Sequence, residues 1–348
     1  MLKGALIGIG RLGRVHYQDL IDFEKKRDDL KFVAICDIDP AKLEGKHSAR
    51  SNVDNTANDS LDLSRFNLYT DYDEMLEKEE LDFVVLAIPT DLHSPFAIKA
   101  MEKGVNVFSE KPMAHTAEAA RAMVECAERT GMKLQIGHVL RFWPEYIYLK
   151  EITENETFGK TISAHYWRGG YQDHVANPSY ENWIIDKNRG GGGLFDQHVH
   201  DADLILWLYD MPKAVFTQGK EIFEQSANDV MLTTYVYGDK VITARDDTAC
   251  KGYPFNYGYE VSFEKAMVRY ENNVVTVWPE HEDPYTPDTD KYRFYSHAYY
   301  TELEYFMDAI KNDTKIERAT PEQGYATIRL VEAEAESAAT ALPVVPKN

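Results

Sequence analysis

The chain has 348 residues, of which 44% are hydrophobic and 12% aromatic. This length predicts two domains, and this composition predicts globular folding and argues against extended disorder. Lysine and arginine total 38 against 58 aspartate and glutamate residues, for a formal net charge of −20. Because a field of that sign repels phosphate backbones and anionic lipid surfaces, we expect no nucleic-acid partner and no membrane partner.

Targeting signals and cysteine usage point to a soluble cytoplasmic protein. No apolar run approaches the ~18 residues that a transmembrane helix needs, and the first ten residues lack the length and cleavage site of a secretory signal. Cys36, Cys126 and Cys250 are odd in number and widely spaced. They form no CxxC pair and no disulfide framework.

The start of the chain has the pattern of a dinucleotide-binding unit. An apolar run at residues 2–8 leads into Gly8-Ile9-Gly10-Arg11-Leu12-Gly13, a helical pattern covers residues 12–23, and a second apolar run covers residues 31–36. In this order of strand, glycine turn, helix and strand, the first glycine makes the tight turn and the second lets the backbone approach a pyrophosphate. The third lets the helix pack on the strand. The helix N-terminus would bind the phosphates.

The acidic residue that follows the second strand indicates the cofactor. Asp37 would accept hydrogen bonds from the ribose hydroxyls of the adenosine. Since its carboxylate repels a 2′-phosphate, we predict NAD in preference to NADP. Arg11 and Arg14 lie close by in the sequence, and they keep NADP as the alternative.

Strands and helices continue to alternate as far as residue 137, which predicts a doubly wound parallel sheet for residues 1–137. A polar stretch at residues 51–60 predicts an exposed loop. The remaining strands are expected at 66–69, 81–88, 105–109 and 133–137, and the helices at 72–78, 91–103 and 116–130.

The pattern changes after His138, so residues 138–348 are predicted to form an α+β domain for substrate binding and oligomerisation. Period-2 alternation in β-branched and tyrosine-rich segments indicates a large, mainly antiparallel sheet. Its strands are expected at 160–167, 213–219, 230–237, 240–246, 257–263, 266–270 and 273–277. Helices are expected at 144–152, 297–310 and 321–338, and the C-terminal helix could pack back on the first domain. One broad face of such a sheet often packs against another subunit, which makes a homodimer or homotetramer the expected assembly.

A glycine run at residues 190–193 precedes the stretch with the most polar chemistry. A helix is predicted from about Leu194, and on it Asp196, His200, Asp203 and Trp207 would share one face. A carboxylate one turn from an imidazole can fix its tautomer and raise its basicity, which suits a general acid and base. Asp203, one turn further on, could hold the other side of the ring.

Glu110-Lys111-Pro112 follows a strand at the carboxyl edge of the predicted parallel sheet, where ligands of open α/β folds collect. A lysine there could orient a hydroxyl group and stabilise alkoxide character during hydride loss.

Taken together these motifs resemble the glucose–fructose oxidoreductase / inositol dehydrogenase / MocA family of nicotinamide-dependent oxidoreductases. The resemblance spans nearly the whole chain and also includes Ala87-Ile88-Pro89-Thr90-Asp91-Leu92-His93. It implies hydride transfer between NAD and a secondary alcohol of a sugar, a polyol or an inositol-like cyclitol. Which of these is the substrate stays open.

The resemblance also assigns residues. His200 would be the acid/base, Lys111 would position and polarise the hydroxyl, and Asp196 would bind substrate and hold His200. Around the cofactor it places Ile88, Pro89, Thr90, His93, Glu110 and Lys111, in addition to the glycine motif and Asp37. Substrate-side candidates are Arg141, which could face the cleft, with Trp183 and Tyr257 as weaker ones; no metal ligands are implied.

Alternative interpretations stay open at this point. Many family members have a small residue two positions before the catalytic histidine, where this chain has His198. His198 and His200 with Asp201 and Asp203 also resemble a metal-hydrolase cluster, although histidines two apart on a helix diverge by roughly 200° and could share a metal only on a strand. The same fold could also serve an NAD-dependent glycosidase acting through transient oxidation, or a non-catalytic regulator that binds NAD or sugar.

Overall fold

The computed structural model describes residues 1–45, 60–170, 183–184, 186–223, 226–249, 252–293 and 297–347. Nearly all of the predicted loop at residues 51–60, and Cys250, lie outside these residues. The chain divides into two compact units. The first comprises Met1–Ala114, Glu118–Gly137 and Tyr299–Glu322, and the second comprises His115–Ala117, His138–Ala298 and Gln323–Asn348.

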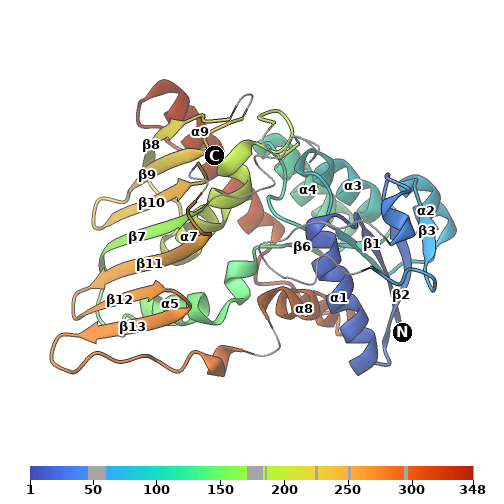
Figure 1. Cartoon of the computed structure of the whole chain (residues 1–348), viewed down its shortest axis with the longest axis horizontal. Helices are drawn as coiled ribbons and strands as arrows, with labels where there is room; N and C mark the ends of the chain where they lie inside the picture. The colour runs from blue at the N-terminus through green and yellow to red at the C-terminus, as the bar shows by residue number, and fades with distance from the viewer. Residues whose placement is uncertain are drawn as a thin grey trace. The chain divides into compact units, whose positions relative to one another are not determined.

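The first unit contains a six-stranded parallel sheet, which confirms the predicted doubly wound fold (Figure 1). Its strands are β1 (Leu2–Ile7), β2 (Leu30–Cys36), β3 (Asn67–Tyr69), β4 (Phe83–Leu86), β5 (Asn106–Ser109) and β6 (Leu134–Ile136). They lie in the order β3-β2-β1-β4-β5-β6. The order reverses between β1 and β4, and open α/β sheets bind ligands at this kind of switch point.

The helices of the first unit lie between its strands in the sequence. They are α1 (Arg11–Lys26), α2 (Tyr72–Lys78), α3 (Thr90–Glu102) and α4 (Ala117–Thr130). The carboxylate of Asp71 caps α2 by accepting a hydrogen bond from the backbone N–H of Glu74, as expected for an aspartate at an N-cap.

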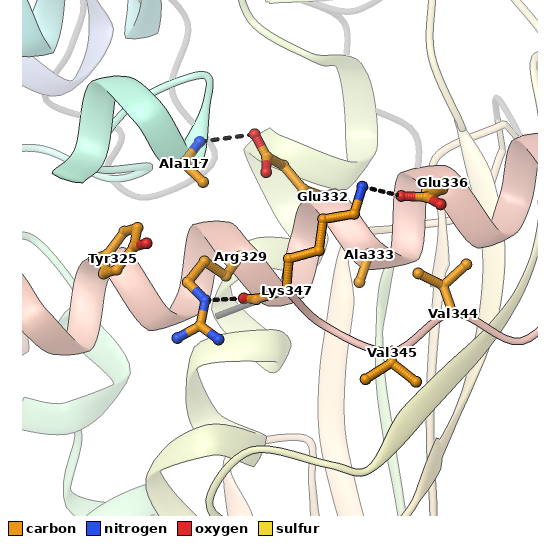
Figure 2. Close-up of a pocket in the computed structure, with 9 residues that line it drawn as sticks. All are labelled: Ala117, Tyr325, Arg329, Glu332, Ala333, Glu336, Val344, Val345 and Lys347. Atoms are coloured by element: carbon orange, nitrogen blue, oxygen red, sulfur yellow. Dashed lines mark hydrogen bonds and ion pairs between the residues drawn. The ribbon is translucent and has the colours of Figure 1, made fainter.

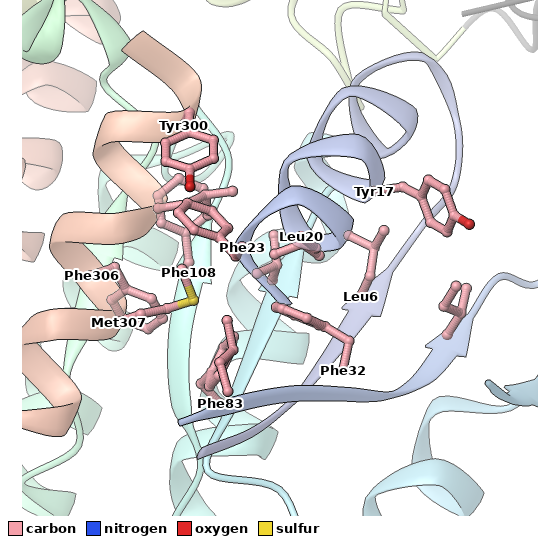
Figure 3. Close-up of a cluster of buried hydrophobic side chains, with 14 of the residues drawn as sticks. Leu6, Tyr17, Leu20, Phe23, Phe32, Phe83, Phe108, Tyr300, Phe306 and Met307 are labelled. Atoms are coloured by element: carbon pink, nitrogen blue, oxygen red, sulfur yellow. The ribbon is translucent and has the colours of Figure 1, made fainter. Parts of the chain in front are cut away.

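A later helix, α8 (Ala298–Lys311), joins the core of this unit. Figure 3 shows α8 beside α1, with side chains of both packed on the same face of the sheet. The rings of Phe23 and Tyr300 lie 3.9 Å apart between centroids, and Phe306 contacts both Phe83 and Phe108. The helix predicted at residues 297–310 therefore forms, but its residues from Tyr299 onward belong to the first unit, whereas the sequence pattern placed them in the second domain.

The second unit contains a seven-stranded sheet in the order β13-β12-β11-β7-β10-β9-β8. Its strands are β7 (Thr161–Gly169), β8 (Ala214–Lys220), β9 (Val230–Val236), β10 (Val241–Asp247), β11 (Asn256–Phe263), β12 (Ala266–Glu271) and β13 (Val274–Pro279). All neighbouring pairs are antiparallel except β7 and β10, which run parallel. The predicted mainly antiparallel sheet is thus confirmed.

Three helices cover one face of this sheet: α5 (Pro144–Glu154), α7 (Val199–Tyr209) and α9 (Pro321–Thr340) (Figure 1). The tyrosine-rich strands direct rings into this layer, and Tyr166, Tyr235, Tyr259 and Tyr270 are all buried. Buried tyrosine hydroxyls need partners. The hydroxyl of Tyr259 accordingly donates to the carbonyl of Glu145 in α5, and that of Tyr166 pairs with the hydroxyl of Tyr209 in α7. Among the described residues, no helix has the length and apolar character that crossing a membrane requires.

Candidate active site

The loop between β1 and α1 has the close approaches that the glycine motif predicts. Gly8 has a φ of +85°, and a Cβ there would lie 2.4 Å from the carbonyl oxygen of Ala87. A Cβ on Gly13 would lie 2.0 Å from the carbonyl oxygen of Gly8, so helix and loop touch at this point. A Cβ on Gly10, by contrast, would meet no atom within 4 Å. The loop therefore leaves open space beside the N-terminus of α1, which fits a dinucleotide pyrophosphate.

Asp37 is held directly against this loop. It follows β2 and is 5% exposed. One carboxylate oxygen accepts a hydrogen bond from the backbone N–H of Ile9 at 2.9 Å, and the other accepts one from the N–H of Asp39 at 2.9 Å. The Nζ of Lys42 lies 3.7 Å from the same carboxylate. The carboxylate is thus fixed at the end of β2, where ribose hydroxyls would be recognised.

The residues after β4 are held from inside the unit. Ile88 and Pro89 are half-buried, and α3 begins at Thr90, which is buried. His93 is buried too, with Nδ1 2.7 Å from the carbonyl oxygen of Pro112 and Nε2 2.9 Å from that of Ile88. Burial, the largest effect, lowers the pKa of His93, although the two carbonyl contacts oppose it. His93 therefore ties the segment after β4 to the segment after β5.

Glu110 and Lys111 follow β5 immediately. Glu110 is 3% exposed, and its Oε1 lies 2.7 Å from Nε2 of His16 on α1. Its Oε2 accepts the backbone N–H of Lys111 at 3.0 Å. A Cβ on Gly137 would lie 3.0 Å from this carboxylate, so a larger residue there would require the carboxylate to shift. The contacts of Glu110 with His16 and with the backbone of Lys111 form a buried clamp that fixes the backbone of Lys111. Lys111 itself is half-buried.

A second carboxyl group lies in the same interior. Glu302 on α8 is fully buried, and burial raises its pKa well above the usual range, with further contributions from Glu110 and Asp19. Burial thus disfavours the charged form of Glu302, and Glu110 has His16 as its hydrogen-bonding partner.

In the second unit the glycine run leads into a local change of helix type. Gly191 and Gly192 have φ values of +80° and +69°, and the carbonyl oxygen of Trp183, a half-buried residue, would lie 2.2 Å from a Cβ on Gly190. Residues Leu194–His198 form a π-helical turn that continues into α7. The predicted helix thus begins as a π turn, a rare form that is frequent at functional sites.

Asp196 lies in the π turn and His200 lies in the first turn of α7. Asp196 is half-buried, and its carboxylate accepts a hydrogen bond from the side-chain amide of Gln197 at 3.0 Å. His200 is 8% exposed. The predicted pairing of Asp196 with His200 stays a prediction.

Asp203 has partners that the sequence pattern did not indicate. Its two carboxylate oxygens each accept a 2.9 Å hydrogen bond from the guanidinium of Arg141, and Thr327 on α9 donates to it at 3.0 Å. Burial, the largest effect, would raise the pKa of Asp203, but Arg141 and His138 outweigh it and lower that pKa. Asp203 therefore anchors α7 through a bidentate arginine, and its predicted contact with the ring of His200 stays a prediction. Arg141 is 2% exposed in this pair, and its predicted position facing the cleft stays a prediction.

Further contacts hold the same helix from the sheet. Asp201 accepts hydrogen bonds from Arg168 on β7 at 3.1 and 3.2 Å. The guanidinium of Arg168 also lies over the ring of Tyr257, a half-buried residue on β11. Tyr257 is thus adjacent to the anchor of the helix. Sequence reasoning did not identify His16 or Arg168, because the sequence pattern does not indicate the distant partner of a single polar residue.

His198 has partners of its own within the second unit. The Nε2 of His198 contacts Tyr235 and Glu334, and among the described residues no group of three or more His, Cys, Asp and Glu side chains is arranged to hold a metal ion.

A surface cavity of about 370 Å³ lies elsewhere in the second unit (Figure 2). It is formed by α9, the C-terminal segment and Ala117. Several of its charged groups have partners within the cavity lining. Glu336 forms an ion pair with Lys347, and Glu332 accepts a hydrogen bond from the backbone N–H of Ala117. None of the residues that the sequence assigns to the site lines it.

The fold and these side chains define a class of protein: a two-unit oxidoreductase with a dinucleotide-binding sheet and an anchored Asp–His helix. Residues 2–138 match the model described as "Oxidoreductase family, NAD-binding Rossmann fold", and residues 146–269 match the "GFO/IDH/MocA C-terminal domain". The chain therefore belongs to the Gfo/Idh/MocA family of oxidoreductases, as the sequence motifs indicated.

Individual relatives share different lengths of the chain. The scyllo-inositol 2-dehydrogenase (NAD(+)) of Bacillus subtilis is 27% identical over 324 residues, which cover 89% of this chain and 86% of the relative. The 2,7-anhydro-N-acetylneuraminate hydratase of Mediterraneibacter gnavus is 32% identical over 157 residues, covering 45% of this chain. The similar segment spans only 41% of that hydratase.

Among solved structures, a levoglucosan dehydrogenase in complex with NADH and levoglucosan superposes with a TM-score of 0.83 and covers 100% of both chains. At 18% sequence identity this similarity establishes a shared fold.

Proposed function

We propose that this protein is an NAD-dependent dehydrogenase that oxidises a secondary alcohol of a sugar, a polyol or an inositol-like cyclitol. The observation that carries the proposal is the buried His16–Glu110 clamp, which fixes Lys111 at the carboxyl edge of a dinucleotide-binding sheet. Lys111 belongs to the first unit, while Asp196 and His200 belong to the second. Their meeting in one site is part of this proposal.

The proposed reaction separates a hydride from the carbon and a proton from the hydroxyl group. When bound, the nicotinamide would supply the hydride acceptor. A ring nitrogen of His200 takes the hydroxyl proton, and the ammonium of Lys111 stabilises the negative charge that develops on the alcohol oxygen. Asp196 binds the substrate and orients His200, as the family resemblance implies.

The cofactor assignment rests on the loop and on Asp37. The open space beside Gly10 accommodates a pyrophosphate, and the fixed carboxylate of Asp37 matches two ribose hydroxyls better than a 2′-phosphate. Lys42, 3.7 Å from this carboxylate, reduces the repulsion of a phosphate. We therefore propose NAD as the main cofactor and NADP as a weaker one.

The substrate class is tested with a panel of sugars, polyols and inositols. Each is mixed with the protein and either NAD or NADP, and the absorbance of the reduced nicotinamide is followed. Reduction of NAD with at least one polyhydroxylated alcohol is the expected result. If no member of the panel reduces either cofactor, the dehydrogenase proposal fails.

A second candidate function is an NAD-dependent glycosidase that acts through transient oxidation. The relative named a hydratase favours this candidate. An enzyme that oxidises its substrate transiently would convert it without net formation of NADH. Product analysis by mass spectrometry separates the two candidates, since the second predicts turnover with catalytic amounts of NAD and no net change in absorbance.

We further propose that the protein forms a homo-oligomer through the uncovered face of the seven-stranded sheet. Exposed apolar side chains point away from the helices on this face: Leu232 and Val236 on β9, Val241 on β10, and Val274 and Trp278 on β13. A second copy of the chain would bury them.

A further inference from the structure

His198 is a fully buried polar residue at the end of the π turn. Its Nε2 lies 3.1 Å from the hydroxyl of Tyr235 on β9 and 3.3 Å from Oε1 of Glu334 on α9. Both partners are also buried, at 1% and 0% exposure. One imidazole therefore connects the π turn to a strand and to the last helix.

The direction of this contact bears on His200. Residues two apart on a helix point about 200° apart around its axis. Because His198 points toward β9 and α9, His200 is directed away from them, and the same contact that holds one ring sets the direction of the other.

The charge balance of the surroundings explains why the contact is strong. Burial, the largest effect, lowers the pKa of His198, but attraction and hydrogen bonding by Glu334, with Asp246 and Asp201, outweigh it and raise that pKa to about 9. At neutral pH the contact with Glu334 is therefore an ion pair.

Two further carboxyl groups, those of Asp246 and Asp201, lie near this ion pair. Asp246 on β10 is fully buried, and burial, the largest effect, raises its pKa well above the usual range. Asp201 on α7 is paired with Arg168 on β7. The cationic partner of Glu334 is thus the ring of His198. Removing that ring would leave the buried charge of Glu334 unpaired, which is strongly unfavourable.

The π turn supplies a reason for such an anchor. It accommodates one residue more than an α turn, and it is a rare form of helix. Reversion to α geometry would change the angle around the helix axis between residues within the turn and those after it. Asp196 would then no longer lie where it does with respect to His200.

We propose that His198, Glu334 and Tyr235 form a positioning triad that holds the π turn and thereby fixes Asp196 relative to His200. The proposal rests on the proposed catalytic roles of Asp196 and His200. His198 itself is a positioning residue, since it acts through the turn.

The structural arm of the test is amide hydrogen exchange, measured by mass spectrometry on peptides covering residues 190–203. The variant His198→Met removes the polar contacts at similar volume, and His198→Gln retains an N–H donor. The control Tyr209→Phe removes a buried hydrogen bond, to Tyr166, at the other end of α7. We expect faster exchange in His198→Met, near wild-type exchange in His198→Gln, and no change in these peptides in the control.

The kinetic arm uses the substrate found with the panel. We expect His198→Met to lower kcat by about tenfold or more with little change in the KM for NAD, and His198→Gln to recover most of kcat. The double variant His198→Met/Glu334→Met should lose no more than His198→Met alone, because the two residues act as a pair.

The two arms separate this proposal from the proposed function. A folded His198→Met protein with wild-type exchange would overturn the triad, and so would an unchanged kcat in that variant. If wild-type protein turns over no member of the panel, the proposed function fails, whereas the exchange result still decides whether the triad holds the turn.

Discussion

The polar residues from Asp196 to Asp203 have different partners despite their closeness in sequence. His198, Asp201 and Asp203 bind α9, β7 and the segment around Arg141, respectively. Asp196 and His200 are the two that the family resemblance assigns to catalysis. A polar residue near a catalytic motif can therefore anchor the helix that carries the motif. Its residue type alone does not distinguish an anchoring role from a catalytic one.

The proposed catalytic residues His200 and Lys111 give the first prediction. His200→Ala should reduce kcat by roughly 10²–10⁴-fold, the usual range for general acid–base catalysis, while NAD still binds. Lys111→Ala should also lose rate, because charge on the alcohol oxygen develops mainly in the transition state. Steady-state kinetics and NAD titration measure both effects. His281, whose side chain is 84% exposed, provides the matched control His281→Ala. Near wild-type kcat in His200→Ala would contradict the acid–base assignment.

Cofactor choice gives the second prediction. Asp37→Ser should weaken NAD binding, because a carboxylate that accepts hydrogen bonds from ribose is removed, and should strengthen NADP binding, because repulsion is relieved. The ratio of kcat/KM for the two cofactors measures the change. A wild-type preference for NADP of about tenfold or more, ~1.4 kcal/mol, would show that Asp37 has been assigned wrongly.

At the scale of elements, the loop between β1 and α1 separates stability from binding. A Cβ on Gly13 would collide with the carbonyl oxygen of Gly8, whereas a Cβ on Gly10 meets nothing within 4 Å. Gly13→Ala should therefore lower Tm, since backbone atoms must move. Gly10→Ala should keep the Tm of the wild type and lose NAD affinity, because its methyl group occupies the space expected for the pyrophosphate. Thermal unfolding with and without NAD tests the pair, and equal Tm values for the two variants would be inconsistent with it.

The contact between the π turn and α9 predicts a pH dependence of stability. The pKa of His198 is raised to about 9 in the folded state, above the ~6.5 of an unfolded histidine. The folded state thus binds the proton more tightly, so the stabilisation is fully present below about pH 6.5 and is lost as pH rises toward 9. The slope reaches about 1.4 kcal/mol per pH unit.

Urea unfolding across this pH window measures the effect. The difference in unfolding free energy between wild type and His198→Gln should shrink as pH rises, because glutamine does not titrate. A difference that stays constant from about pH 6.5 to 9 would show that folding does not raise the pKa of His198.

At the scale of the whole molecule, the open face of the seven-stranded sheet predicts assembly. Light scattering at micromolar concentration should give a mass well above the 39.9 kDa of one chain. Val241, at 62% exposure, lies on this face, and Val241→Glu should reduce the mass because a charge is costly to bury. Lys265→Glu, which changes charge outside a strand, is the control. A monomeric wild type would end the proposal.

Periodicity and punctuation allowed most elements to be predicted. Alternating apolar runs and helical patterns specify β1 to β6 with their helices, because each buries one face or both in a predictable way. The glycine motif and Asp37 were likewise readable, since a tight turn and a close helix–strand contact exclude larger side chains. Tyrosines on alternate positions similarly marked the strands of the second sheet.

The sequence by itself determined the two kinds of sheet, the dinucleotide loop and the family. Only the tertiary structure decided that α8 joins the first unit, because an amphipathic helix can cover any apolar face. It also decided the buried polar contacts, whose members lie 62, 94 and 136 positions apart for Arg141–Asp203, His16–Glu110 and His198–Glu334. A charge in a sequence does not name its partner; burial does, because each charge removed from water must find an opposite charge or a hydrogen bond nearby.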